Sequence, residues 1–214
     1  MSSEEPARGY HHGNLREALV EAGVALARDG GPTAIQLRAV SRQAGVSHNA
    51  AYRHFANQED LVAAVAERCM HQLGLLMIER MQVVTVRDRV RRAQERLQAI
   101  GLAYIEFART EPGWFRTAFT SAQPHPSAEK ARETPPPADE RFTSPFALLN
   151  ERLDELVEVG AVTPARRQGA EFVAWSAVHG ISSLLLDGPL RNLPEPEVGP
   201  VIAAVLGGVN HGLY

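Results

Sequence analysis

The stretch "QLRAVSRQAGVSHNAAYRHF", residues 36–55, contains the signals that decide the fold. Its first part predicts a short helix over 36–44, because apolar residues recur at helical spacing and Gly45 supplies the positive-φ position that ends a helix. Ser47 is a favoured N-cap residue and predicts a second helix directly after it. Ala51 and Phe55 lie four residues apart and should face the core, so the polar residues around them face outward.

Two histidines in this stretch raise the question of a metal or catalytic site. Histidines that chelate a metal from one helix face are three or four residues apart, whereas His48 and His54 lie roughly 120° apart around the axis. No cysteine or acid nearby completes a metal site, and no carboxylate orients a base for Ser47. We therefore expect no metal, no cofactor and no enzymatic activity here.

The remaining interpretation is geometric. Two short helices joined by a glycine turn, with small, polar and basic groups exposed on the second, form a helix-turn-helix. Arginine can bind guanine, asparagine can pair with adenine, and tyrosine hydroxyls and backbone N–H groups can bind phosphates. The stretch therefore predicts a surface that contacts double-stranded DNA.

The charge distribution points to the same partner. The whole chain carries a net charge of −3, yet residues 30–58 contain no Asp or Glu and include Arg38, Arg42 and Arg53. A confined positive patch in an acidic protein favours a confined anionic partner. The longest apolar runs are too short to cross a membrane and the N-terminus has no signal-like apolar region, so we expect a cytoplasmic protein without membrane contact. The single cysteine, Cys69, is expected in the core.

The chain as a whole predicts an all-α protein, because no strand-like alternation occurs. Asn14 and Glu17 form a capping box at the start of the first helix. Further helices are expected at about 60–81, with Leu61 and Val65 in its apolar stripe, and at 87–110, with Val90 in its stripe. Others follow at 145–159, 164–186 and 195–209, after a short aromatic segment at 114–119.

Three parts of different character follow from this pattern. Residues 1–13 are predicted to be a flexible arm, whose Arg8, Tyr10, His11 and His12 either lie along a DNA groove or belong to a disordered tail. Residues 14–58 form the helix-turn-helix domain and 59–214 a larger helical domain. The segment 121–142, rich in proline, serine and charge, is expected to be a mobile loop.

Residues 34–62, "AIQLRAVSRQAGVSHNAAYRHFANQEDLV", resemble the DNA-binding signature of the TetR family of transcriptional regulators. The AGVS turn, the Tyr52–Phe55 pair and the Glu59-Asp60-Leu61 start of the next helix carry the resemblance, and "WSAVHG" at 175–180 resembles the C-terminal domain of one subgroup. The resemblance implies an operator-contacting set made up of Arg38, Ser47, His48, Asn49, Ala50, Tyr52, Arg53 and His54. Ala50 replaces a common threonine and Gln58 a common lysine, which suggests a distinct operator or weaker phosphate contacts.

The same resemblance implies a homodimeric repressor that binds a palindromic operator and is released by a small-molecule effector. The dimer surface is expected on the last two long helices, where bulky and small residues alternate, although intramolecular packing would give the same pattern. Residues that could line an effector pocket, or simply the core, are Met70, Leu73, Met77, Leu97, Tyr104, Phe107, Trp114, Phe119, Trp175 and His179. For His179 a structural role is favoured. The alternative for the chain is a helical small-molecule-binding protein or an enzyme whose N-terminal bundle is only structural.

Overall fold

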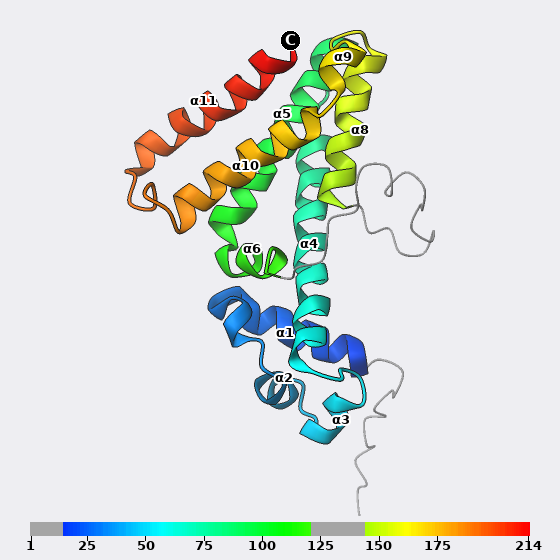
Figure 1. The fold of residues 1–214 in the computed structure, drawn as a ribbon, viewed down its shortest axis with the longest axis vertical. Helices are drawn as coiled ribbons and strands as arrows, with labels where there is room; N and C mark the ends of the chain where they lie inside the picture. The colour runs from blue at the N-terminus through cyan, green and yellow to red at the C-terminus, as the bar shows by residue number, and fades with distance from the viewer. Residues whose placement is uncertain (1–14, 121–143) are drawn as a thin grey trace, which may run out of the picture.

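The computed structural model describes residues 15–120 and 144–214, and these are helical with no strand (Figure 1). The all-α prediction is therefore confirmed. The elements are α1 (Leu15–Gly30), η2 (Pro32–Ala34), α2 (Leu37–Gln43), α3 (His48–Tyr52), α4 (Gln58–Gln82), α5 (Arg89–Thr110), α6 (Pro112–Ala118), α8 (Pro145–Glu158), α9 (Pro164–Arg167), α10 (Ala170–Leu186) and α11 (Glu195–Leu213). The Asn14 cap, the 1–13 arm and the 121–142 loop lie outside the described residues.

Side-chain caps fix where the helices begin. Ser47 Oγ accepts a hydrogen bond from Ala50 N at 3.2 Å and starts α3, as the sequence predicts. Three further caps were not predicted. Thr163 Oγ1 accepts from Arg166 N at 3.4 Å at α9. At the two long helices, Asn57 Oδ1 accepts from Asp60 N at 2.8 Å at α4, and Asp88 Oδ1 accepts from the backbone N–H of Arg91 in α5 at 2.8 Å. Both helices begin within two residues of their predicted starts.

Two predictions about the larger part of the chain are wrong. The single helix expected over 164–186 is divided into α9 and α10, because Gly169 adopts φ 76° and interrupts the helical backbone. Arg167 anchors this break through hydrogen bonds to Asp154, Glu171 and Asn150 at 2.7–2.8 Å. In α5, Val90 is 36% exposed; the buried stripe begins one turn later, where tertiary packing covers the helix.

Helix α4 is the central element of the fold. It runs from the small α1–α3 unit to the opposite end of the molecule, and α1, α5, α6 and α8 pack directly against it (Figure 1). Its predicted apolar stripe is buried along the whole length, at Leu61, Val65, Met70, Leu73 and Met77. By length and composition α4 could also cross a membrane, but its apolar face is covered by four neighbouring helices, as expected of a core helix.

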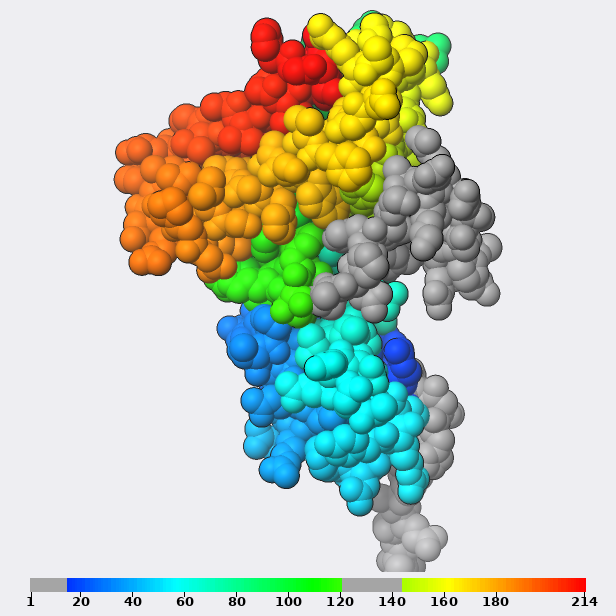
Figure 2. Space-filling model, in the orientation of Figure 1, coloured from blue at the N-terminus to red at the C-terminus, as the bar shows by residue number. Residues whose placement is uncertain are grey.

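The short helix α6 joins the two parts of the molecule. It lies between α1 and the upper helices, and Trp114 Nε1 donates a hydrogen bond to the carbonyl oxygen of Val24 at 2.8 Å (Figures 1 and 2). A Cβ atom on Gly113 would lie 2.1 Å from the carbonyl oxygen of Arg28 and 2.2 Å from that of Ala27. Only glycine permits this approach, so α6 is fixed against the C-terminal end of α1.

We expect Gly113→Ala to lower the free energy of unfolding by about 1–3 kcal/mol, because the added methyl group meets rigid backbone. Urea denaturation followed by circular dichroism measures the change. Arg28→Ala serves as the control at the same junction: it removes the ion pair with Glu111 and the guanidinium 5.0 Å from the centroid of the Trp114 ring, leaves the backbone packing intact, and should change the stability less. Equal losses in the two variants would contradict the importance of the close backbone contact.

Candidate nucleic-acid interface and ligand cavity

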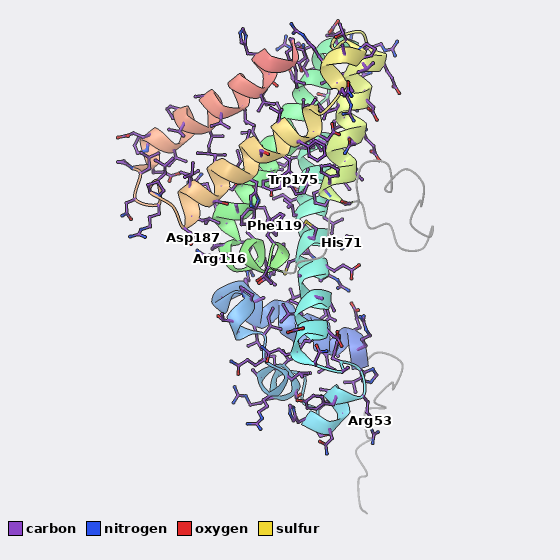
Figure 3. All side chains as sticks on the ribbon, in the orientation of Figure 1. Arg53, His71, Arg116, Phe119, Trp175 and Asp187 are labelled. Atoms are coloured by element: carbon purple, nitrogen blue, oxygen red, sulfur yellow. The ribbon has the colours of Figure 1, made fainter. Side chains whose placement is uncertain are left out.

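The turn and the helix of residues 45–55 have the geometry expected for a helix-turn-helix. Gly45 has φ 69° and ends α2, while Ala51 and Phe55 are buried at 0% and 2% exposure. Asn49, Arg53 and His54 are exposed, and Tyr52 is 48% exposed. Figure 3 shows Arg53 at the end of the molecule that is opposite α9. The polar side chains of α3 therefore form an outward surface on an apolar base.

His48 is less exposed than its neighbours. Its ring packs edge-on against Tyr52, with 4.7 Å between the ring centroids, and the side chain is half-buried. Within the described part of the chain, its buried Nδ1 atom has no hydrogen-bond partner. The expectation that the His48 side chain is exposed is therefore corrected: its ring packs against the Tyr52 ring, and only part of it is accessible to solvent. Ala50 is also half-buried.

The arginines of this surface are electrostatically available. Arg38, Arg42 and Arg53 are exposed, and none of them forms an ion pair within residues 15–120 and 144–214. Several arginines elsewhere are paired with acids: Arg80 with Glu106, for example, which lowers the pKa of that carboxyl group through a hydrogen bond. Because no acid lies within 30–58, an incoming phosphate meets uncompensated positive charge.

Two contacts hold this surface on its support. The Arg16 guanidinium lies over the Phe55 ring, 5.2 Å from its centroid, and Arg68 of α4 is hydrogen-bonded to both Glu17 and Glu21 of α1. These contacts connect the segment directly after α3 to α1, and α1 to α4. The orientation of the exposed surface is thus coupled to the position of α4.

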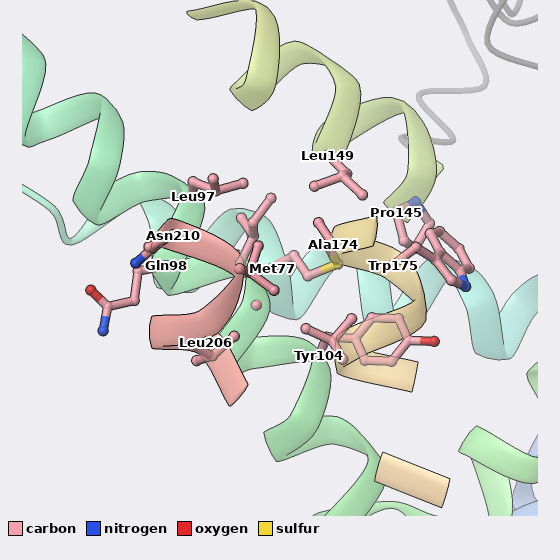
Figure 4. A pocket seen from close by; sticks show the side chains of 14 residues that line it. Met77, Leu97, Gln98, Tyr104, Pro145, Leu149, Ala174, Trp175, Leu206 and Asn210 are labelled. Carbon is pink, nitrogen blue, oxygen red and sulfur yellow. The ribbon is translucent and has the colours of Figure 1, made fainter. Parts of the chain in front are cut away.

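A cavity that is partly open to solvent lies among α4, α5, α8, α10 and α11 (Figure 4). Four of the ten residues proposed for an effector pocket line it: Met77, Leu97, Tyr104 and Trp175. The lining residues that the sequence did not predict come from α5, α8, α10 and α11: Gln98, Ile100, Gly101, Pro145, Leu149, Ala174, Val178, Leu206, Val209 and Asn210. No local sequence pattern indicates that α8 and α11 lie near α4, so their lining residues could be identified only from the three-dimensional structure.

The other proposed pocket residues lie elsewhere. Met70 and Leu73 belong to the core stripe of α4. Phe107 stacks on Trp114, with centroids 6.3 Å apart, at the junction with α1. Phe119 and His179 are next to the cavity, in a cluster of aromatic rings around Tyr104.

The aromatic cluster connects the cavity with α6. Tyr104 OH and His179 Nδ1 are hydrogen-bonded at 2.9 Å, in agreement with the structural role favoured for the histidine. The Tyr104 ring lies 5.9 Å from Trp175, 5.7 Å from Phe115 and 6.1 Å from Phe119, measured between centroids. Burial raises the pKa of Tyr104 above its usual range, so its hydroxyl stays protonated. Side chains lining the cavity are therefore in direct contact with α6.

No group of three His, Cys, Asp or Glu suited to a metal ion occurs among the residues the structure covers. Cys69 is buried, and burial raises its thiol pKa to about 12. Cys69 therefore contributes to core packing. The two candidate functional sites are the α2–α3 surface and the cavity.

Two segments of the chain match known family models. Residues 19–65 match the family model of bacterial regulatory proteins, tetR family, and residues 97–207 match the tetracyclin repressor-like C-terminal domain. The second match spans more than half of the chain and includes "WSAVHG". A search of curated proteins found no significant match.

Solved structures share the fold. A protein of unknown function from Rhodococcus sp. RHA1 is 25% identical, with TM-score 0.71 and coverage of 97% of this chain and 99% of that one. The fatty acid degradation regulator FadR from Bacillus halodurans is 17% identical, with TM-score 0.62 and coverage of 95% and 98%. A TetR variant from Acinetobacter baumannii AYE, in complex with minocycline, is 15% identical, with TM-score 0.61 and coverage of 95% and 96%.

We expect Ser47→Ala to lower the free energy of unfolding by about 1 kcal/mol, because the Ala50 N–H loses its side-chain acceptor at the start of α3. Thermal or urea denaturation measures the loss. Ser47→Asp restores an N-cap acceptor and should retain most of the stability. An equal loss in both variants would mean that the cap does not stabilise this helix.

Proposed function

The chain belongs to the TetR family of transcriptional regulators, and we propose that it is a repressor that binds a palindromic operator as a homodimer and is released by a small-molecule effector. The observation that carries the proposal is the exposed α3 surface, where Asn49, Tyr52 and Arg53 stand on the buried Ala51 and Phe55. Residues 14–58 form the operator-binding domain and 59–214 the effector and dimerisation domain. The proposed function requires no catalytic step. A protein that binds the operator must be located in the cytoplasm, where the DNA is.

In the operator complex, Arg53 and Asn49 contact base edges in the major groove, and the Tyr52 hydroxyl donates a hydrogen bond to a phosphate oxygen. Arg38 and the N–H groups at the Ser47 cap add phosphate contacts, and His48, Ala50 and His54 lie at the same interface. Ala50 presents a methyl group suited to thymine. The exposed Gln58 supplies no charge to the backbone, so affinity depends more on the arginines.

The dimer surface is proposed on the outer faces of α10 and α11. Phe172, Val173 and Leu184 of α10 are among the most exposed large apolar residues, at 60%, 62% and 41%. The exposed positions of α11 between 199 and 208 are small and uncharged: Gly199, Pro200, Ala203, Ala204, Gly207 and Gly208. Small side chains permit close helix approach, and covering the apolar ones stabilises a dimer. Two copies then present α3 surfaces to half-sites about 34–36 Å apart, or a multiple.

The effector is proposed to act through α6. A ligand in the cavity contacts Tyr104 and Trp175, and Tyr104 packs against Phe115 and Phe119 at the end of the cavity. On its other side α6 holds α1 through Gly113 and Trp114. We propose that the rings and α6 adopt two alternative positions and that the ligand binds one of them more tightly. The ligand therefore shifts α6 and α1 towards that position, and the two α3 surfaces of the dimer no longer match the spacing of the operator half-sites.

We expect Arg53→Ala to weaken operator binding by about 1–3 kcal/mol, because a base or phosphate contact is lost. Fluorescence anisotropy with DNA from upstream of the chain's own gene, at fixed salt, measures the affinity. Arg89→Ala is the matched control: it removes an exposed arginine at the start of α5, at the opposite end of α4. Absence of any complex at low salt and micromolar protein would contradict the proposed function.

We expect Ala204→Arg to convert the dimer to a monomer and to weaken operator binding by roughly 100-fold or more, because the two linked half-sites become separate. Sedimentation velocity measures the mass and anisotropy the affinity. Ala165→Arg places the same side chain on the exposed surface of α9 and should change neither. A dimer that survives Ala204→Arg would place the interface elsewhere.

A further inference from the structure

The cavity among α4, α5, α8, α10 and α11 has walls without a charged side chain. Its 14 lining residues include no Asp, Glu, Lys, Arg or His. The only side-chain amides among them are those of Gln98 and Asn210, and the hydroxyl of Tyr104 is already hydrogen-bonded to His179. The remaining surface is almost wholly apolar.

The polar and apolar walls are separated in space. In Figure 4 the amides of Gln98 and Asn210 lie at one end, whereas the rings of Tyr104 and Trp175 lie at the other. Met77 lies between the two ends. Gln98 is exposed and Asn210 half-buried, so the amide end is the mouth of the cavity. A bound molecule would therefore meet hydrogen-bonding groups first and apolar surface deeper in.

Two arginines on α5, the helix that supplies much of the wall, are held by acids outside the cavity. Arg96 is paired with Glu155 at 3.0 Å, and Arg109 with Glu195 at 2.7 Å. An ionised head group would lose part of its hydration at the mouth, or all of it deeper in, and would find no opposite charge among the lining residues, which disfavours its binding. A carbonyl, hydroxyl or amide group would instead be satisfied by the two carboxamides, because each both donates and accepts.

We propose that this cavity binds an uncharged organic molecule with an apolar body and one hydrogen-bonding head group. The head group is held at Gln98 and Asn210, and the body packs between Met77 and the rings of Tyr104 and Trp175. The proposal rests on the effector role given to the cavity above and names the chemical class of the effector. The flexible thioether of Met77 accommodates variation in the shape of the body.

Four probes that share one body test the class of ligand: phenylhexanol, phenylhexanamide, phenylhexanoate and phenylhexylammonium. Each is titrated calorimetrically into the full chain at neutral pH. We expect the alcohol and the amide to bind at least about tenfold more tightly than either ion. Equal or tighter binding of an ion, or no binding of any probe, overturns the proposal.

Two variants locate the probes in the cavity. Ala174→Phe fills space in the wall and should weaken binding of the neutral probes by about tenfold or more, whereas Ala165→Phe on α9 should not. Gln98→Arg places a cation at the exposed mouth, so it should raise the affinity for phenylhexanoate relative to phenylhexanol; Gln168→Arg, away from the cavity, should leave the ratio unchanged. A binding pattern that neither cavity variant alters overturns the assignment, and Gln98→Arg alone decides it if Ala174→Phe misfolds.

Operator affinity measured with each probe separates this proposal from the proposed function. If the neutral probes bind with the expected preference and also release operator DNA, both hold. If they bind in the cavity but leave operator affinity unchanged, the ligand class holds and the release mechanism fails. If only an ionised probe releases the DNA, the proposed class is overturned while a regulatory cavity remains.

Discussion

The continuous apolar stripe of α4 is the constraint on which the rest of the structure depends. Leu61 and Val65 at one end belong to the core that supports α1–α3, and Met77 near the other end lines the cavity. At Gly23 of α1 an added Cβ would lie 2.5 Å from a methyl carbon of Val65, so the two helices are in close contact. A single helix therefore extends from the α1–α3 unit to the cavity, and it packs against side chains at both ends.

Local signals in the sequence determined much of this arrangement. The Gly45 turn, the Ser47 cap and the Ala51–Phe55 pair could be predicted directly, because each depends on residues within one helical turn. The break at Gly169 was not predicted, because a glycine can also occur inside a helix. The hydrogen bonds that hold Arg167 at this break come partly from Asp154 and Asn150 of α8, which are distant in sequence. The half-burial of His48 likewise depends on how its ring meets Tyr52.

The cavity was the least predictable feature, because its walls are assembled from five helices. A periodic apolar stripe indicates that a residue faces inward, but not whether it meets another side chain or the wall of a cavity. Leu73 and Met77 share one face of α4 and are both buried, yet only Met77 lines the cavity. The difference is decided by α8, α10 and α11, whose placement no short window of sequence specifies.

The contacts between α6 and α1 differ in what they can transmit. The Arg28–Glu111 ion pair lies on the surface, with the arginine side chain 57% exposed, so solvent screens it and it can re-form after a small displacement. The packing of Gly113 on the Ala27 and Arg28 carbonyls, and the Trp114–Val24 hydrogen bond, have no such freedom. A displacement of α6 would therefore be passed to α1 through this packing more directly than through the ion pair. Since the Arg16–Phe55 contact connects α1 with the segment directly after α3, the proposed effector mechanism depends on this tight packing rather than on the ion pair.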